Sequence, residues 1–482
     1  MIQEFLTSAL SQKAVHGQPL LYEAAINSYR GAARHFDRTC GMEADELSAE
    51  LKFLKNLNWD PKCKQTILFV RPRSDVHAQS AEGVYRVVEL SESPDARPSF
   101  ANGRAKLPQL RWNWMVSNAL SADPENSSEW TKLLIFELSR LLKAVGPSLI
   151  CIVSDTPPLE RAISLVANSL GIPVATIQHG LFTTKVDPAI LEGSASNYFV
   201  VWGEFTKRLL SEGGAMAPDR IKVVGYPYVL NPLPERTIAP MDEPAIVFLG
   251  QNFEDFDPAK AKAKDRIVKL LQESCKQRGI RFLYRPHPAE KPESLSALVA
   301  PESLLSRRQP LAELFANYDC FVGLTSTALP EAALYGKTAI QVYDDAFEFE
   351  NLGELGVCHS CQSTDEGVGR MLDSIINREI QPLQVSPDYI SMPASLEIRL
   401  REIYAEIIAE VLDPNTTLST KISEPLRNEI VALTQESNAA CSQSTLREAK
   451  RAIQNARSLT DRLRATPAGH LIAKTLRKLR HK

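Results

Sequence analysis

The chain has 482 residues, of which 44% are hydrophobic and 23% are charged. This length and composition predict a globular protein of about two to four domains, with two large ones favoured, and exclude a disordered chain, a coiled coil and a collagen-like fibre. The net charge of −3 argues against a protein that coats nucleic acid over its whole surface. The sequence has no run of 18 apolar residues, so we expect no membrane-spanning helix.

The first part of the chain has a mixed pattern. We expect mostly helix over residues 1–60, and strands at 66–71 and 85–90. Residues 92–108 are rich in Ser, Pro, Asn and Gly, which predicts a loop. An amphipathic helix is expected at 129–145.

A regular alternation of strands and helices follows. Nearly continuous apolar runs predict strands that are buried on both faces, as in parallel sheets covered by helices. The predicted strands are 147–155, 172–178, 198–202 and 221–225, and the predicted helices between them are 159–170 and 204–212.

The alternation restarts after a proline-containing linker at residues 230–243. The sequence therefore predicts two doubly wound α/β units, with a ligand cleft at the carboxyl ends of their strands. The second unit has predicted strands at 245–250, 280–284, 319–323 and 338–342, and predicted helices at 259–278, 311–317 and 328–335. A further amphipathic helix is predicted at 395–412, after this unit.

Residues 446–482 form a basic tail. They contain 11 Lys and Arg residues against two acidic residues, a net charge of about +9, which leaves about −12 for the rest of the chain. Apolar residues interleaved with these charges predict a helix that lies on an anionic membrane surface. A solvated basic tail is the alternative.

Polar residues follow two predicted strands of the first unit. Asp155 closes one strand, where a carboxylate acts as a base or nucleophile, or caps the next helix. Gln178, His179 and Gly180 close the next strand. His179 can donate to a phosphate or transfer a proton, although a structural histidine is the alternative, and Gly180 lets a ligand approach the backbone. We expect Asp155 and His179 to be catalytic, and Gln178 and Gly180 to line the cleft.

Two cationic residues follow a strand of the second unit, in the sequence Arg285-Pro-His287-Pro. The prolines restrict the backbone around both side chains. Arginine binds phosphate or carboxylate in a bidentate manner, and histidine supplies a single hydrogen bond. The pair predicts an anionic ligand, and a proline-rich turn with incidental charges is the alternative.

Three hydroxyl residues, Thr325, Ser326 and Thr327, follow another strand of the second unit and precede a helix. They cap the helix, or the N–H groups and dipole at the helix start bind a phosphate. Glu331, one turn into the helix, reaches a ribose hydroxyl or belongs to a capping box. We expect a nucleotide phosphate to bind between His287 and these hydroxyl residues.

Several familiar motifs are missing from the sequence. It has no Gly-x-Gly-x-x-Gly after the first strand, no Walker phosphate loop, no His-Glu-x-x-His and no Gly-x-Ser-x-Gly. This disfavours a dehydrogenase, a kinase, a metalloprotease and an esterase. Cys358 and Cys361 form one Cys-x-x-Cys without the second pair that a zinc ribbon needs, and we expect no metal.

The segments 171–180, 198–203 and 220–227 resemble bacterial surface-polysaccharide glycosyltransferases of the GT-B fold. The Arg-Pro-His287-Pro and Thr-Ser326-Thr sequences are similar to the His-Pro and Ser/Thr motifs of CMP-sugar-dependent bacterial sialyltransferases and β-Kdo transferases. The resemblance spans about residues 147–345.

The resemblance implies an α/β protein of the GT-B fold, in which two Rossmann-like domains face a cleft. It implies that His287, Ser326 and Thr327 hold the CMP phosphate and that Asp155 or His179 acts on the acceptor. No cofactor or metal is expected, because cationic groups and helix dipoles neutralise the leaving nucleotide. The implied segments are an acceptor domain (1–235), a nucleotide-sugar domain (236–395), a crossing helix with a linker (396–445) and the basic tail (446–482).

The resulting hypothesis is a cytoplasmic glycosyltransferase, peripheral on the inner face of the cell membrane. It would transfer Kdo or a sialic acid from a CMP-activated donor to a glycan acceptor on a lipid carrier, and nucleic acid is not an expected partner. The alternatives are a CDP-polyol phosphotransferase, a UDP-sugar-using enzyme or epimerase of the same fold, and a non-catalytic scaffold.

Overall fold

The computed structural model describes part of the chain. The predicted basic tail, Asp155 and most of the predicted helical region 1–60 lie outside the described residues. The described residues are 2, 4, 6 and 46–439, with gaps at 72–74, 92–97, 121–123, 155, 183–193, 228–232, 238–243, 255–256, 414–415, 417 and 419–421.

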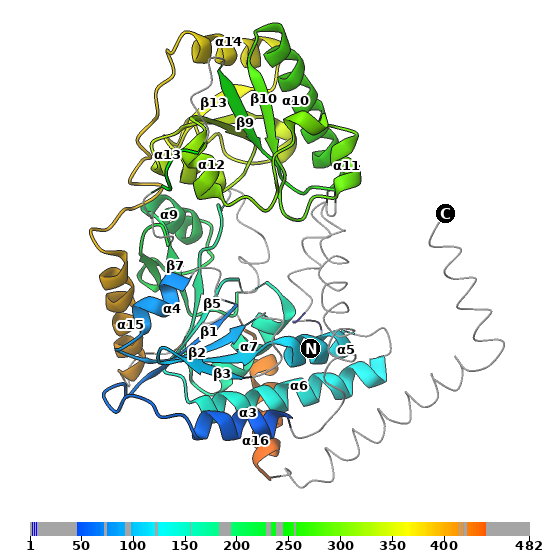
Figure 1. Ribbon diagram of the computed structural model, residues 1–482. Coiled ribbons are helices and arrows are strands. Elements are labelled where there is room, and N and C mark those ends of the chain that lie inside the picture. The colour runs from blue at the N-terminus through cyan, green and yellow to red at the C-terminus, as the bar shows by residue number, and fades with distance from the viewer. Residues whose placement is uncertain are drawn as a thin grey trace, which may run out of the picture.

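The first sheet has eight strands in the order β3-β4-β2-β1-β5-β6-β7-β8 (Figure 1). All neighbours are parallel except β3 and β4, which pair antiparallel. The chain winds outward from β1 on one side and from β5 on the other, as the predicted doubly wound unit requires. The strands are β1 (Thr66–Val70), β2 (Arg86–Ser91), β3 (Ser99–Ala101), β4 (Arg104–Pro108), β5 (Leu149–Ile152), β6 (Val174–Ile177), β7 (Tyr198–Val201) and β8 (Ile221–Val223).

The prediction of a loop over residues 92–108 is wrong, because β3 and β4 lie within this segment. The charged residues Arg104 and Lys106 hide the apolar pattern of β4. Arg104 is nevertheless buried, since its guanidinium lies 2.8 Å from the Glu89 carboxylate on β2 and 3.2 Å from Asp75. A buried ion pair thus replaces the apolar contact that the pattern would have revealed.

The second sheet has five parallel strands in the order β10-β9-β11-β12-β13. The first four match the predicted strands of the second unit, and β13, at the edge, contains the Cys-x-x-Cys residue Cys361. The strands are β9 (Ala245–Leu249), β10 (Arg281–Arg285), β11 (Cys320–Gly323), β12 (Thr338–Tyr343) and β13 (His359–Gln362).

Helices cover both sheets, and local sequence signals set their ends. α10 begins where the Asp257 side chain accepts hydrogen bonds from two backbone N–H groups of the first turn, and it ends before Gly279, whose φ is +66°. The described helices are α3 (Glu46–Lys55), α4 (Asp75–Ala81), α5 (Leu110–Ala119), α6 (Pro124–Val145), α7 (Pro158–Ser169), α9 (Glu204–Glu212), α10 (Pro258–Gln277), α11 (Pro292–Ser296), α12 (Leu311–Asn317), α13 (Ala328–Leu334), α14 (Asp365–Ile376), α15 (Leu396–Leu412) and α16 (Glu424–Ala439), with short 3-10 turns η1 (Pro218–Arg220), η2 (Pro301–Ser303) and η3 (Asp345–Phe347).

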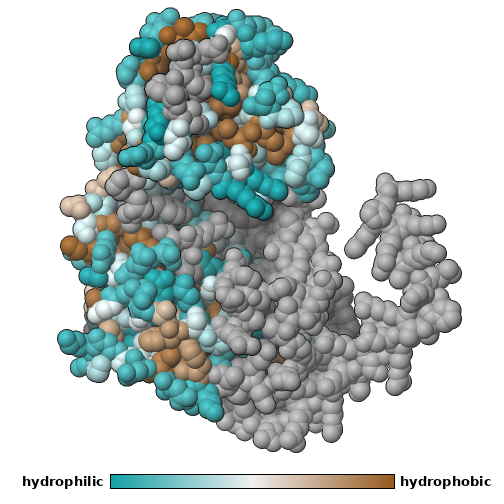
Figure 2. Space-filling model, in the orientation of Figure 1, coloured by the Kyte–Doolittle hydropathy of each residue, from teal (hydrophilic) through white to brown (hydrophobic). Residues whose placement is uncertain are grey.

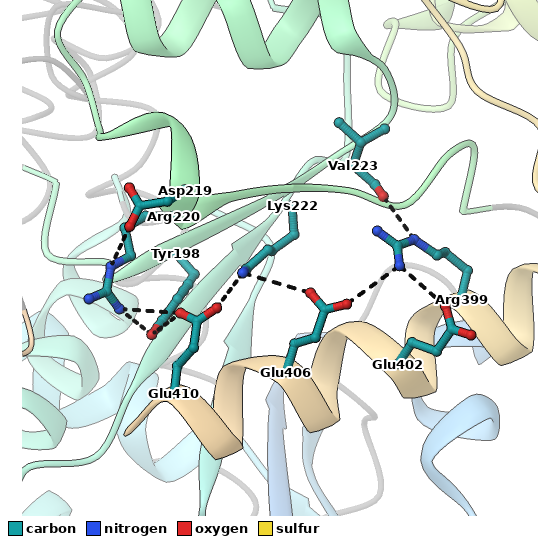
Figure 3. A network of polar contacts seen from close by, with 9 residues as sticks. All are labelled: Tyr198, Asp219, Arg220, Lys222, Val223, Arg399, Glu402, Glu406 and Glu410. Carbon is teal, nitrogen blue, oxygen red and sulfur yellow. Dashed lines mark hydrogen bonds and ion pairs between the residues drawn. The ribbon is translucent and has the colours of Figure 1, made fainter. Parts of the chain in front are cut away.

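After α14 the chain crosses back to the first domain, where α15 packs on the sheet (Figure 1). Its apolar face, which includes Tyr404, is buried in the same core as β1 and β7. Its polar face forms the network of Figure 3, in which Lys222 Nζ lies 2.5 Å from Glu410 and Arg399 Nε donates to the Val223 carbonyl at 3.3 Å. α15 therefore binds the first domain through both apolar and charged contacts.

The carboxyl edges of the two sheets face each other. Trp202, after β7, and Tyr226, after β8, are 1% and 3% exposed and pack in a core cluster with Leu249 and Leu329 of the second domain. The Trp202 carbonyl also accepts a hydrogen bond from the Ser391 N–H, at 2.9 Å. Figure 2 shows hydrophilic residues along the margin of the second domain that faces the first. The edges at which both sheets end thus form the predicted cleft region.

Candidate active site

The second sheet places its candidate residues around a topological switch point. β10 lies on one side of β9 and β11 on the other, so the loops after these strands meet at the end of β9, the position at which doubly wound folds form a ligand crevice. His287 follows β10, Gln251 follows β9 and Thr325 follows β11. Gln251 bridges the crevice, because its amide donates to Thr325 Oγ1 at 2.8 Å and accepts from the Thr325 N–H at 2.9 Å.

Arg285, at the end of β10, and Glu331, in α13, are close enough for each charge to act on the pKa of the other. Both residues are half-buried. Burial raises the pKa of Glu331 to about 6, although the hydroxyl of Tyr226, which donates to the carboxylate, and the nearby Arg285 oppose the rise. Burial lowers the pKa of Arg285, and Arg285 Nε is buried without a hydrogen-bond partner among the described residues. An unpaired buried cationic donor is a favourable place for an anion.

His287 presents one imidazole nitrogen outward. Its Nδ1 accepts a hydrogen bond from the Ala289 N–H at 3.2 Å, so the proton of the neutral ring is on Nε2. Partial burial of the ring lowers the pKa of His287. The negative charge of Glu290 raises this pKa, and the positive charges of Arg285 and Lys264 lower it. The ring is therefore a neutral Nε2–H donor near pH 7, which suits a phosphate oxygen.

The three hydroxyl residues have different environments. Ser326 Oγ accepts from the Ala328 N–H at 3.2 Å, so in this structure it caps α13, which has only seven residues. Thr325 is held by Gln251, as described above. Thr327 is exposed, and its Cγ2 lies 3.9 Å from where a Cβ on Gly180 would be, so it faces the first domain. The capping box is not observed, because Thr327 makes no side-chain cap and Glu331 accepts from Tyr226.

On the first-domain side, Gln178 is a supporting residue. Its side chain is buried, accepts from the Trp202 N–H at 2.8 Å and donates to the Gly180 carbonyl at 2.9 Å. These bonds fix the turn that carries the half-buried His179, and the next residue, Gly180, lies near Thr327 of the second domain. Asp155 lies outside the described residues, so its catalytic role stays a prediction.

Two residues of the site were not predicted. Gln251 directly follows a predicted strand, so the rule that singled out Arg285 and Thr325 could also have found it. Tyr226 follows β8 in the same way, but its partner Glu331 lies more than 100 positions away in the other domain, and no local pattern links the two. The structure supplies that pairing.

Two observations concern metals and membranes. Within the described ranges, no three His, Cys, Asp or Glu side chains gather in a way that could hold a metal ion. Among the helices of the same part of the chain, none combines the length and apolar character needed to cross a membrane.

A family model for alpha-2,8-polysialyltransferase (POLYST) matches residues 219–344. This range contains Tyr226, Arg285, His287 and Glu331 together with the three hydroxyl residues. None of the curated protein sequences matches this chain significantly.

Several solved structures are similar in shape at low sequence identity. A glycosyltransferase from Rickettsia africae ESF-5 is 12% identical, with a TM-score of 0.40, over 78% of this chain and 99% of that one. A UDP-N-acetylglucosamine 2-epimerase is 14% identical, with a TM-score of 0.45, over 74% of this chain and 99% of that one. The wall teichoic acid polymerase TagF is 14% identical, with a TM-score of 0.39, over 86% and 99%.

Two facing doubly wound domains and a helix that crosses back to the first domain agree with the predicted GT-B architecture. Over residues 219–344 the chain is similar to the alpha-2,8-polysialyltransferases.

Proposed function

We propose that the protein transfers a sialic acid or Kdo from a CMP-activated donor to a glycan acceptor, in the synthesis of a bacterial capsule or lipopolysaccharide. The observation that carries the proposal is the gathering of Arg285, His287 and Thr325 at the switch point of the second sheet. The range matched by the polysialyltransferase model, which includes these residues, supports a sialic acid donor.

The proposed reaction breaks the bond between the anomeric carbon of the sugar and the CMP phosphate oxygen. The electron pair of that bond stays on the phosphate, where negative charge grows. Arg285 and the Nε2–H of His287 would stabilise this charge, and Glu331 would accept a hydrogen bond from the ribose. The acceptor hydroxyl forms the new bond to the anomeric carbon, and Asp155 or His179 of the first domain would take its proton.

The test is donor turnover by the full-length protein. CMP-sialic acid, CMP-Kdo, CDP-glycerol and UDP-N-acetylglucosamine are each supplied with an oligosaccharide acceptor, and nucleotide release and glycan products are measured. We expect turnover of a CMP-sugar, and a loss of about 100-fold or more in kcat/KM for Arg285→Ala and His287→Ala. His359→Ala, on the edge strand β13, is the matched control and should retain activity.

Other outcomes point elsewhere. Consumption of CDP-glycerol alone would replace the proposal by a polyol phosphotransferase, and conversion of the UDP-sugar without an acceptor would indicate an epimerase. If no donor were consumed, the non-catalytic scaffold would be favoured.

We also propose that residues 446–482 hold the enzyme at the anionic inner leaflet, beside a lipid-linked acceptor. The support is the tail's charge of about +9 in a chain whose net charge is −3. The intact chain should sediment with vesicles containing phosphatidylglycerol but not with phosphatidylcholine vesicles, and less in high salt. Equal binding by a chain lacking 446–482 would refute the tail's role.

A further inference from the structure

A buried ion pair lies beneath the loops of the proposed donor site. The side chains of Lys264, on α10, and Glu290, after β10, are both 0% exposed, and Lys264 Nζ lies 2.6 Å from Glu290 Oε1. The same ammonium lies 2.5 Å from Glu254 Oε1 and donates to the Gln251 carbonyl at 3.0 Å. Each of its three protons thus has an acceptor.

Glu290 joins this pair to the His287 loop. Its Oε1 also accepts from the Tyr284 hydroxyl at 2.7 Å, and its Oε2 accepts from the backbone N–H of His287 at 2.6 Å. The end of β9 packs closely on the same carboxylate, because a Cβ on Gly250 would lie 2.4 Å from Glu290 Oε2. The position of the His287 backbone therefore depends directly on the Glu290 carboxylate.

The pair also reaches Thr325, through Gln251. Lys264 holds the Gln251 carbonyl, and the Gln251 side chain exchanges two hydrogen bonds with Thr325. The loops that end β9, β10 and β11 are consequently tied to one charged network. Because Lys264 and Glu290 have no exposed side-chain surface, neither contacts a ligand in the crevice.

Stability alone does not account for this arrangement. Removing two charges from water is costly, and apolar replacement of a buried ion pair is often neutral or stabilising. Here the bonds of the pair run to the backbone of the very loops that carry His287 and Gln251. We propose that Lys264 and Glu290 are positioning residues, which hold His287 and Thr325 at the spacing that the nucleotide phosphate requires. This inference rests on the proposed donor site.

The test compares two ways of removing the pair. In Glu290→Gln, an amide nitrogen takes the place of Oε2 and faces the His287 N–H donor to donor, while the carbonyl still accepts from Lys264 and Tyr284. The double variant Lys264→Met/Glu290→Met removes both charges together and keeps side chains of similar volume. Glu293→Gln, an exposed neighbour, is the matched control.

CMP binding to the full chain is measured by calorimetry, and thermal unfolding is followed in parallel. We expect both variants to lose about 10- to 100-fold in CMP affinity, the effect of a lost hydrogen bond to a charged group. The double variant should unfold within a few degrees of the unmodified protein, and Glu293→Gln should bind normally. A double variant that binds CMP like the unmodified protein would overturn the proposal, because the pair would then be replaceable packing.

A second readout needs no nucleotide. The imidazole signal of His287 is followed by NMR in ¹³C-histidine-labelled protein and is assigned as the signal lost in His287→Ala. The Glu290 charge raises the pKa of His287, whereas the charges of Arg285 and Lys264 lower it. Glu290→Gln should therefore lower the pKa of His287 and shift the ring signal. A His287 ring signal that Glu290→Gln leaves unchanged in the neutral form would refute the positioning role, because the His287 loop held by Glu290 would then not have moved. If the unmodified protein bound no CMP, CDP or UDP, the proposed function would fail, while this signal would still show whether Glu290 holds the His287 loop.

Discussion

Glu331 allows a quantitative test of whether the crevice is built for a ligand rather than for stability. Burial raises the pKa of its carboxyl from 4.5 to about 6. Ionisation of Glu331 therefore lowers the stability of the folded state by about 2 kcal/mol. The folded protein binds this proton more tightly than the unfolded chain. Stability from this group is therefore highest below pH 4.5, falls as the pH rises from 4.5 to 6, and stays low above pH 6.

The variant Glu331→Gln keeps the shape and the acceptor for Tyr226 but cannot ionise. We predict that it is more stable than the unmodified protein at pH 8, by up to about 2 kcal/mol, and that the difference disappears near pH 4.5. Urea unfolding at pH 4.5, 6 and 8 measures this, with the exposed Glu313→Gln as control. The same variant should bind CMP more weakly, because it loses the charged acceptor for the ribose. The reasoning would be refuted if the variant were less stable than the unmodified protein at pH 8, or if their free energies of unfolding differed by the same amount at every pH.

Two further predictions concern packing and charge. Gly250→Ala should lower the free energy of unfolding, measured with urea, by about 1–3 kcal/mol, because the new Cβ would lie 2.4 Å from the buried Glu290 carboxylate. Gly180→Ala is the control and should leave the free energy of unfolding unchanged, because the nearest atom would lie 3.9 Å from the new Cβ. Equal losses of stability in the two variants would contradict the close packing at Gly250. Glu410→Ala removes the α15 partner of three polar side chains in Figure 3 and should destabilise by about 1 kcal/mol at low salt and less in 1 M NaCl. The exposed Glu402→Ala should have a smaller effect, and a loss at Glu410 that did not respond to salt would argue against an electrostatic contact.

Much of the fold could be predicted because its strands are short apolar runs. β1, β5 and β9 are almost free of polar residues, since parallel strands covered on both faces exclude them. β4 was missed because its buried Arg104 is neutralised by carboxylates from other elements, and a sequence pattern does not reveal such partners. The pattern of apolar residues thus predicts a strand only where the side chains need no specific partner.

The site could be predicted less completely, for a related reason. Residues at or just after the ends of strands, such as Arg285, can be recognised in the sequence because parallel strands end at one edge of the sheet. What each side chain contacts depends on distant residues. Ser326 caps its own helix, Glu331 accepts from Tyr226 of the other domain, and Gln178 supports its own turn. Strand ends therefore located the crevice, whereas the division between ligand-binding and supporting residues needed the structure.

The most direct test of the central claim is calorimetric titration of the full-length protein with CMP, CDP, UDP and GDP, repeated on His287→Ala. We predict selective binding of CMP and a loss of that binding in the variant, whose fold should be unchanged because His287 is exposed and its ring accepts a local hydrogen bond from the Ala289 N–H. Preference for UDP or GDP, or CMP binding that does not depend on His287, would contradict the claim.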